Sequence, residues 1–143
     1  MPLDLRGVCP LLQVYDMPTA IRFYRDILGF TVKATSRPSD DCDWAWLVRE
    51  REIELMLNTA YDPGTRPDTP ERTRLIAHGD TGLFIGCPDT DAAYAYLRGK
   101  GVNLQPPKIA HYGMKQLYFN DPDGFGICFQ WPAPTPDKAE RGD

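Results

Sequence analysis

The chain has 143 residues, of which 42% are hydrophobic and 25% are charged, and this composition is typical of one globular domain or of two small modules joined together. Its formal net charge is −4, with 16 basic and 20 acidic residues, so it lacks the basic surface that a nucleic acid requires. No apolar run approaches the roughly 18 residues that span a bilayer, and residues 1–6 lack the apolar centre of a signal peptide. Neither a nucleic acid nor a membrane is expected as a partner.

The four cysteines are widely spaced and form no CxxC pair. Three of them lie within apolar stretches, which favours small buried hydrophobic residues over a disulfide framework. Such thiols are typical of a reducing compartment, so a cytoplasmic location is predicted. The cysteines are Cys9, Cys42, Cys87 and Cys128.

The first part of the chain predicts a strand, a helix and three further strands. After an apolar strand, Asp16 is expected to cap a helix that has Pro18 in its first turn and ends at Gly29. Apolar residues recur between them at helical spacing. The predicted strands are 9–15, 30–35, 44–48 and 53–57, with a polar hairpin turn at 49–52.

The same order of elements then begins again. Asp89, which stands at a point equivalent to Asp16, is expected to cap a helix that Gly101 terminates. One apolar face of this helix is predicted to carry Ala92, Ala93, Tyr96 and Leu97. The predicted strands are 82–87, 102–104, 115–119 and 125–130, with a turn at 120–124. An α+β fold with two βαβββ modules follows.

The segment 59–80 is rich in Pro, Thr, Asp and Arg and has no periodicity, so a structureless linker or a functional flap is predicted. Its arginines, Arg66, Arg72 and Arg74, either are solvated or cover an anionic ligand. The domain is expected to span 1–132, with module one at 8–58, linker 59–80, module two at 81–131, and a flexible tail at 133–143. The final Arg141-Gly142-Asp143 matches an adhesion tripeptide by chance.

Two longer segments resemble the vicinal-oxygen-chelate superfamily, the group of glyoxalases, bleomycin-resistance proteins and extradiol dioxygenases. LLQVYDMPTAIRFYRDILGF at 11–30 resembles the opening of a module, and YGMKQLYFNDPDGFGICF at 112–129 resembles the closing DPDG hairpin. IELMLN at 53–58 fits the last strand of the first module. The resemblance implies curved mixed sheets around a cleft, with modules paired within one chain or across a homodimer; a homodimer is expected here.

Metal enzymes of the superfamily bind a divalent ion with four side chains. The resemblance places the corresponding positions at Val8, Glu54, Gly82 and Cys128. Only Glu54 is an ordinary ligand there, and the two histidines, His78 and His111, match no ligand position. Neither a metal nor another cofactor is therefore expected.

The resemblance is greatest to the metal-free, bleomycin-resistance-like members. It implies a metal-independent, antibiotic-resistance-like protein that binds a flat, partly cationic small molecule. Trp44 and Trp46 are two residues apart and would face the same way on a strand, forming a platform for such a ligand, although a core or dimer-interface role fits them equally well. The predicted ligand-binding residues are Trp44, Trp46, Glu54, Met56, Tyr112 and Cys128.

Two other functions stay open at this point. One is a lyase, isomerase or dioxygenase-like enzyme with an atypical site, in which Glu54 and His111 are the candidate catalytic residues. The other is a structural or regulatory dimer with a vestigial cleft. The sequence does not name the ligand, and it does not decide whether any catalysis occurs.

Overall fold

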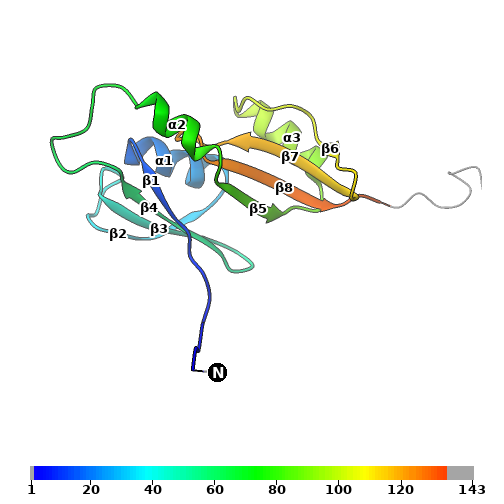
Figure 1. Cartoon of the computed structure of the whole chain (residues 1–143), viewed down its shortest axis with the longest axis horizontal. Coiled ribbons are helices and arrows are strands. Elements are labelled where there is room, and N and C mark those ends of the chain that lie inside the picture. Colours follow the sequence, from blue (N-terminus) through cyan, green and yellow to red (C-terminus); the bar gives the residue numbers. More distant parts are fainter. Residues whose placement is uncertain (1, 135–143) are drawn as a thin grey trace, which may run out of the picture. The chain divides into compact units, whose positions relative to one another are not determined.

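The computed structural model describes residues 2–134, and these form two compact units. The first unit comprises residues 2–76 together with Asp121–Asp123, and the second comprises 77–120 and 124–134. Each unit contains one four-stranded mixed sheet, so the predicted α+β class is confirmed (Figure 1). Among the described residues, no helix is long and apolar enough to cross a membrane. The last nine residues of the predicted tail, 135–143, lie outside the described part of the chain.

The first unit has the predicted order of strand, helix and three strands. Its sheet has the order β1-β4-β3-β2, in which β1 runs parallel to β4 and the other neighbours are antiparallel. Figure 1 shows residues 2–10 as an extended arm that leads into β1. The elements are β1 (Leu11–Val14), α1 (Met17–Arg22), the π-helix η1 (Phe23–Ile27), β2 (Thr31–Thr35), β3 (Trp44–Arg49) and β4 (Ile53–Thr59).

Local sequence signals account for the boundaries of the helical segment. The Asp16 carboxylate accepts a hydrogen bond from the Thr19 amide at 3.1 Å, which satisfies one of the first free N–H groups of α1. Gly29 ends the segment with a φ of 79°, a left-handed conformation that favours glycine. Between them the predicted single helix widens into η1, where the Leu28 amide donates to the carbonyl of Phe23.

The second unit repeats this topology, with the sheet order β5-β8-β7-β6. Asp89 caps its helix by accepting a hydrogen bond from the Ala92 amide at 3.0 Å, as predicted. The elements are β5 (Gly82–Gly86), α3 (Thr90–Gly99), β6 (Lys108–Ile109), β7 (Met114–Asn120) and β8 (Gly126–Pro132). The prediction of two modules with the same order of elements is thus confirmed in its topology.

The strand predicted at 102–104 is wrong. The Val102 amide donates to the carbonyl of Leu97 at 3.0 Å, so it completes the end of α3 instead of a sheet ladder. Pro106 and Pro107 follow, and neither can donate a backbone hydrogen bond. The edge strand therefore begins only at Lys108, as the two-residue β6.

Two further expectations need correction. The segment 59–80 is not structureless, because it contains the seven-residue helix α2 (Arg72–His78). That helix buries none of its residues, so it has no apolar periodicity for a sequence pattern to reveal. In α3 the buried residues are Thr90 and Leu97, whereas Tyr96, predicted to lie on the apolar face, is 49% exposed.

Both cores lie between a sheet and its helix. In the first unit, Ala45 and Leu47 of β3 are fully buried, on the face opposite to Trp44 and Trp46. In the second unit, Leu117 of β7 and Ile127 of β8 are buried in the same way. The alternate residues of each sheet point away from this core, and we call these two surfaces the open faces; they position the candidate site.

The cysteines form no disulfide among the described residues. Cys42 and Cys128 are each 1% exposed, as expected of buried hydrophobic residues. Cys9 and Cys87 are only partly buried, so the expectation of burial holds for two of the four.

Candidate functional site

The open face of the first sheet brings together four of the predicted site residues. Trp46 of β3 lies opposite Met56 of β4, which in turn lies opposite Leu11 of β1. In the flanking rows, Trp44 pairs with Asn58 and Val48 pairs with Glu54. Successive side chains alternate between faces, so Trp44, Trp46, Glu54 and Met56 share one face, and all four are half-buried.

Glu54 gives this face its negative charge. Burial raises the pKa of the neighbouring Cys9 thiol, and the Glu54 carboxylate raises it further through its charge and a hydrogen bond. A protonated thiol beside a carboxylate is a poor nucleophile. What this face offers a ligand is therefore two indole rings, a flexible thioether and one carboxylate, a combination suited to a flat molecule with a cationic group.

The open face of the second sheet forms a groove with a volume of about 900 Å³. Across its floor, Phe84 of β5 lies opposite Cys128 of β8, which lies opposite Tyr118 of β7. The two aromatic rings are 55% and 54% exposed and meet edge to face, with centroids 6.1 Å apart. Two large rings left this open in a groove provide an apolar surface for a ligand.

A polar row lies beside the aromatic one. Gln116 of β7 pairs with Gln130 of β8 on one side and with Lys108 of β6 on the other. The Gln116 side chain is buried, and its amide nitrogen donates to the hydroxyl of Tyr112 at 2.8 Å and to the side-chain oxygen of Gln130 at 2.9 Å. Gln116 thereby fixes the orientation of the two polar groups beside it.

Cys128 lies in this groove but is not an activated thiol. Burial raises its pKa, and a hydrogen bond with Tyr118 only partly opposes that effect. Burial also raises the pKa of Tyr118, as does the neighbouring Cys128. Both groups are therefore protonated near neutrality and serve as lining, not as nucleophile or base.

His111 and Tyr112 lie in the turn before β7, where their rings pack edge to face at 5.1 Å. Both are exposed. Glu54 belongs to the first unit and His111 to the second, so neither unit by itself contains the proposed catalytic pair. The enzyme hypothesis gains no support from the geometry of either unit.

The residues at the positions of the superfamily's metal ligands do not fit a divalent ion. Val8 is an exposed aliphatic residue, Gly82 has no side chain, and Cys128 carries a protonated thiol. Glu54 is the one carboxylate among them. Within residues 2–134, no group of three or more His, Cys, Asp or Glu side chains is placed to bind a metal.

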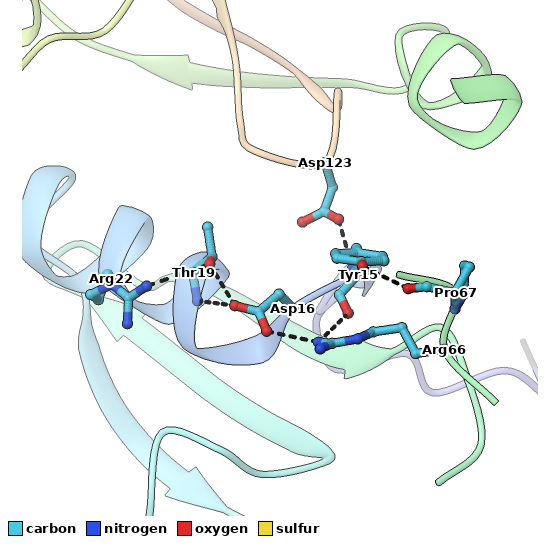
Figure 2. Close-up of polar contacts among 7 residues, drawn as sticks. All are labelled: Tyr15, Asp16, Thr19, Arg22, Arg66, Pro67 and Asp123. Carbon is cyan, nitrogen blue, oxygen red and sulfur yellow. Dashed lines mark hydrogen bonds and ion pairs between the residues drawn. The ribbon is translucent and has the colours of Figure 1, made fainter. Parts of the chain in front are cut away.

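Polar contacts anchor the start of the linker to the β1–α1 turn (Figure 2). Arg66 forms an ion pair with Asp16 at 2.8 Å and lies over the ring of Tyr15. The Tyr15 hydroxyl donates to the carbonyl of Pro67 at 2.7 Å, and its backbone amide donates to Asp123 at 2.7 Å. Arg66 is thus occupied within the first unit, which does not favour the alternative that it covers an anionic ligand.

Sequence reasoning missed several groove residues. Tyr118 and Gln116 alternate along β7 and share a face with Cys128, so an antiparallel pairing of the last two strands would have found them. The same argument, applied to the pairing of β5 with β8, would have identified Phe84. Lys108 could not be identified in this way, because the strand before β7 was predicted at 102–104.

Comparison with known proteins identifies the fold. The family model described as Glyoxalase/Bleomycin resistance protein/Dioxygenase superfamily matches residues 8–129. No curated protein sequence matches the chain.

Solved structures extend this result. TnmS3, an antibiotic binding protein from Streptomyces sp. CB03234, is 26% identical, with a TM-score of 0.65 over 92% of this chain and 100% of its own. UcmS2 is also 26% identical, with a TM-score of 0.67 over 90% of this chain and 98% of its own. TioX from Micromonospora sp. ML1 is 16% identical, with a TM-score of 0.64 over 87% of this chain and 98% of its own, and it supports the fold alone.

Proposed function

Because the chain belongs to the glyoxalase/bleomycin resistance protein/dioxygenase superfamily, we propose that it is a metal-independent small-molecule binding protein for a flat, partly apolar ligand. The observation that carries the proposal is the tryptophan face of the first unit, where Trp44 and Trp46 stand beside Met56 and Glu54. The similarity to TnmS3, an antibiotic binding protein, supports the same class of ligand.

In this proposal the indole rings of Trp44 and Trp46 stack on the ligand, and Glu54 binds a cationic group on its edge. A carboxylate that is partly buried gains from such a partner, since its charge is otherwise poorly solvated. Met56 adapts to the shape of the ring system, because its side chain is flexible and polarisable. The chain performs no chemistry on the ligand.

The proposal includes a homodimer. The N-terminal arm, residues 2–10, exposes Leu3, Leu5 and Val8, which are 62%, 82% and 86% accessible. Apolar side chains in an extended arm are stabilised when a second chain covers them. Sedimentation equilibrium of the full chain, compared with a variant that carries Ser at these three positions, tests this part: the variant is expected to be monomeric.

Titration with proflavine, a flat cation, tests the ligand site through the fluorescence anisotropy of the dye, a signal that does not depend on the tryptophans that the variants remove. Replacing both Trp44 and Trp46 with Leu is expected to weaken binding at least about ten-fold, a loss of roughly 1.4 kcal/mol. Trp131→Phe is the matched control, since this third tryptophan lies on β8 of the second unit. Equal affinity in the double variant and the control would refute the proposed platform.

Metal content of the purified protein, measured by mass spectrometry beside a chelator-treated sample, tests metal independence. No stoichiometric ion and unchanged proflavine binding after chelation are expected, because the donor set contains one carboxylate. About one tightly bound divalent ion per chain would contradict this and would restore an enzymatic interpretation with Glu54 as a ligand.

A further inference from the structure

The groove of the second unit has a different chemical character from the tryptophan face. Its floor has an ordered pattern of side chains, because the four strands of the sheet present aligned rows. The aromatic row is Phe84, Cys128 and Tyr118, and the polar row beside it is Gln130, Gln116 and Lys108. On the other side of the aromatic row, Gly82 pairs with Gly126, so the floor is bare backbone on β5 and β8, and Asn120 of β7 completes that row.

The aromatic row provides a surface on which the flat part of a ligand can pack. Phe84 and Tyr118 contact each other edge to face and leave more than half of each side chain exposed. A Cβ atom at position 82 would come within 3.1 Å of the Phe84 ring, which shows that this ring leans over the glycine row. A planar ring packed here buries both aromatic side chains without displacing any other.

The polar row provides Lys108, which can contact a polar group on the edge of that ligand. Residues in adjacent rows on neighbouring strands are about 7–8 Å apart, so the Lys108 side chain reaches a group held on the Tyr118 ring. No carboxylate of the described residues forms an ion pair with Lys108. The nearest acidic residue that lines the groove, Asp80, precedes β5 at the opposite edge of the sheet, about 14 Å away at the usual strand spacing.

We propose that this groove binds planar aromatic molecules that carry a hydrogen-bond-accepting edge, a carboxylate or a carbonyl oxygen, with the ring on Phe84 and Tyr118 and the acceptor facing Lys108. The inference rests on the proposed function, since it assumes that the chain binds flat small molecules. It adds a second binding surface with the opposite charge preference to that of Glu54.

Three probes with one ring system test the charge preference: 2-naphthoate, 2-naphthamide and (2-naphthyl)methylammonium. Each is titrated into uniformly ¹⁵N-labelled full chain and followed by backbone and indole N–H chemical shifts. We expect 2-naphthoate to shift the amides of β5, β7 and β8 around Phe84, Tyr118 and Cys128. It is expected to bind about five-fold more tightly than the ammonium probe, the effect of one exposed ion pair.

The variants separate the two parts of the site. Lys108→Gln is expected to abolish the preference for 2-naphthoate while leaving 2-naphthamide binding unchanged. Lys115→Gln is the matched control, because Lys115 lies on the other face of the same sheet and pairs with Asp91. Phe84→Ala, with Phe84→Leu as a milder replacement, is expected to weaken all three probes, and the spectra themselves report whether each variant is folded.

The outcomes also separate this inference from the proposed function. If the ammonium probe binds the groove as tightly as 2-naphthoate, or if 2-naphthoate shifts only the indole signals of Trp44 and Trp46, the inference is overturned and the proposed function stands. If no probe shifts residues on either face, and proflavine does not bind, both fall together.

Discussion

Tyr24→Phe is expected to destabilise the first unit by about 2 kcal/mol. The Tyr24 hydroxyl donates to the Asp121 carboxylate at 2.6 Å, and the two residues are 1% and 5% exposed. A hydrogen bond to a charged group contributes about 1.5–3 kcal/mol, and its removal leaves part of a buried carboxylate without its partner. No cavity larger than the hydroxyl is created, so packing adds little to the loss. The Asp121 carboxylate also accepts a hydrogen bond from the amide of Asp123 at 2.9 Å, which the substitution does not touch.

Urea unfolding at pH 7, followed by far-ultraviolet circular dichroism, measures this loss. The matched control is Tyr61→Phe, since that hydroxyl also donates to a carboxylate, Glu71 at 2.7 Å, but at the surface. Its effect should be much smaller, because water replaces an exposed hydrogen bond. Equal losses in the two variants would refute the argument that burial, and not the hydrogen bond alone, sets the magnitude.

The same pair predicts an alkaline effect. Burial raises the pKa of Tyr24 well above its ordinary value of 10.0, and the negative charge of Asp121 raises it further. Because the folded-state pKa is raised, the stability from the protonated hydroxyl is complete below pH 10 and decreases as the pH rises through the folded-state value. The wild-type chain should therefore lose more stability above about pH 10 than Tyr24→Phe.

Three further predictions follow from the same structure. Asp16→Ala should lower the free energy of unfolding by about 1 kcal/mol, because the helix cap is lost. Burial raises the pKa of Asp16, but hydrogen bonds from Thr19 and Arg66 outweigh it and lower that pKa. The contribution of the cap should therefore disappear on acidification below about pH 4, which urea unfolding at a series of pH values measures. Arg66→Ala should speed proteinase K cleavage of the linker, since the ion pair with Asp16 and the contact with Tyr15 are lost; an unchanged cleavage pattern would count against the anchor. Cys128, buried and with a raised pKa, should resist maleimide in the native chain and react after unfolding, which mass mapping detects.

The helix boundaries and the repeat were predictable because their signals are local. Asp16 and Asp89 each cap a helix through their own side chains, and Gly29 supplies a left-handed residue where the first helical segment ends. These interactions involve residues within a turn of each other, so a single sequence contains all the information they need. The position of Trp44 and Trp46 on one face of β3 follows just as directly from the two-residue repeat of a strand.

Features that depend on distant partners were not predictable. The position of β6 at Lys108–Ile109 depends on its pairing with Gln116 and Lys115, and nothing within the two residues signals a strand. Asp121 resembles an ordinary turn residue in the sequence, yet it is buried against Tyr24 of the first unit. Such contacts are decided by packing between segments far apart in the chain, which local patterns do not encode.

The pairing registers show how the two repeated sheets have diverged. Leu11 precedes the capping Asp16 by the same number of residues as Phe84 precedes Asp89, so the two occupy equivalent positions. Leu11 pairs with Met56, whereas Phe84 pairs with Cys128. In the sheets, the counterpart of Cys128 is therefore Met56.

By the same registers, Glu54, two residues before Met56, corresponds to Gly126 and not to Cys128. The carboxylate and the thiol that the family resemblance aligned thus stand in different rows of their sheets. A side chain at 126 is disfavoured as well, since its Cβ would come within 3.2 Å of the Thr81 carbonyl oxygen. The second sheet has Gly126 in the row where the first has Glu54, and it carries Lys108 on its edge strand β6, so the two sheets place different charged side chains on their open faces.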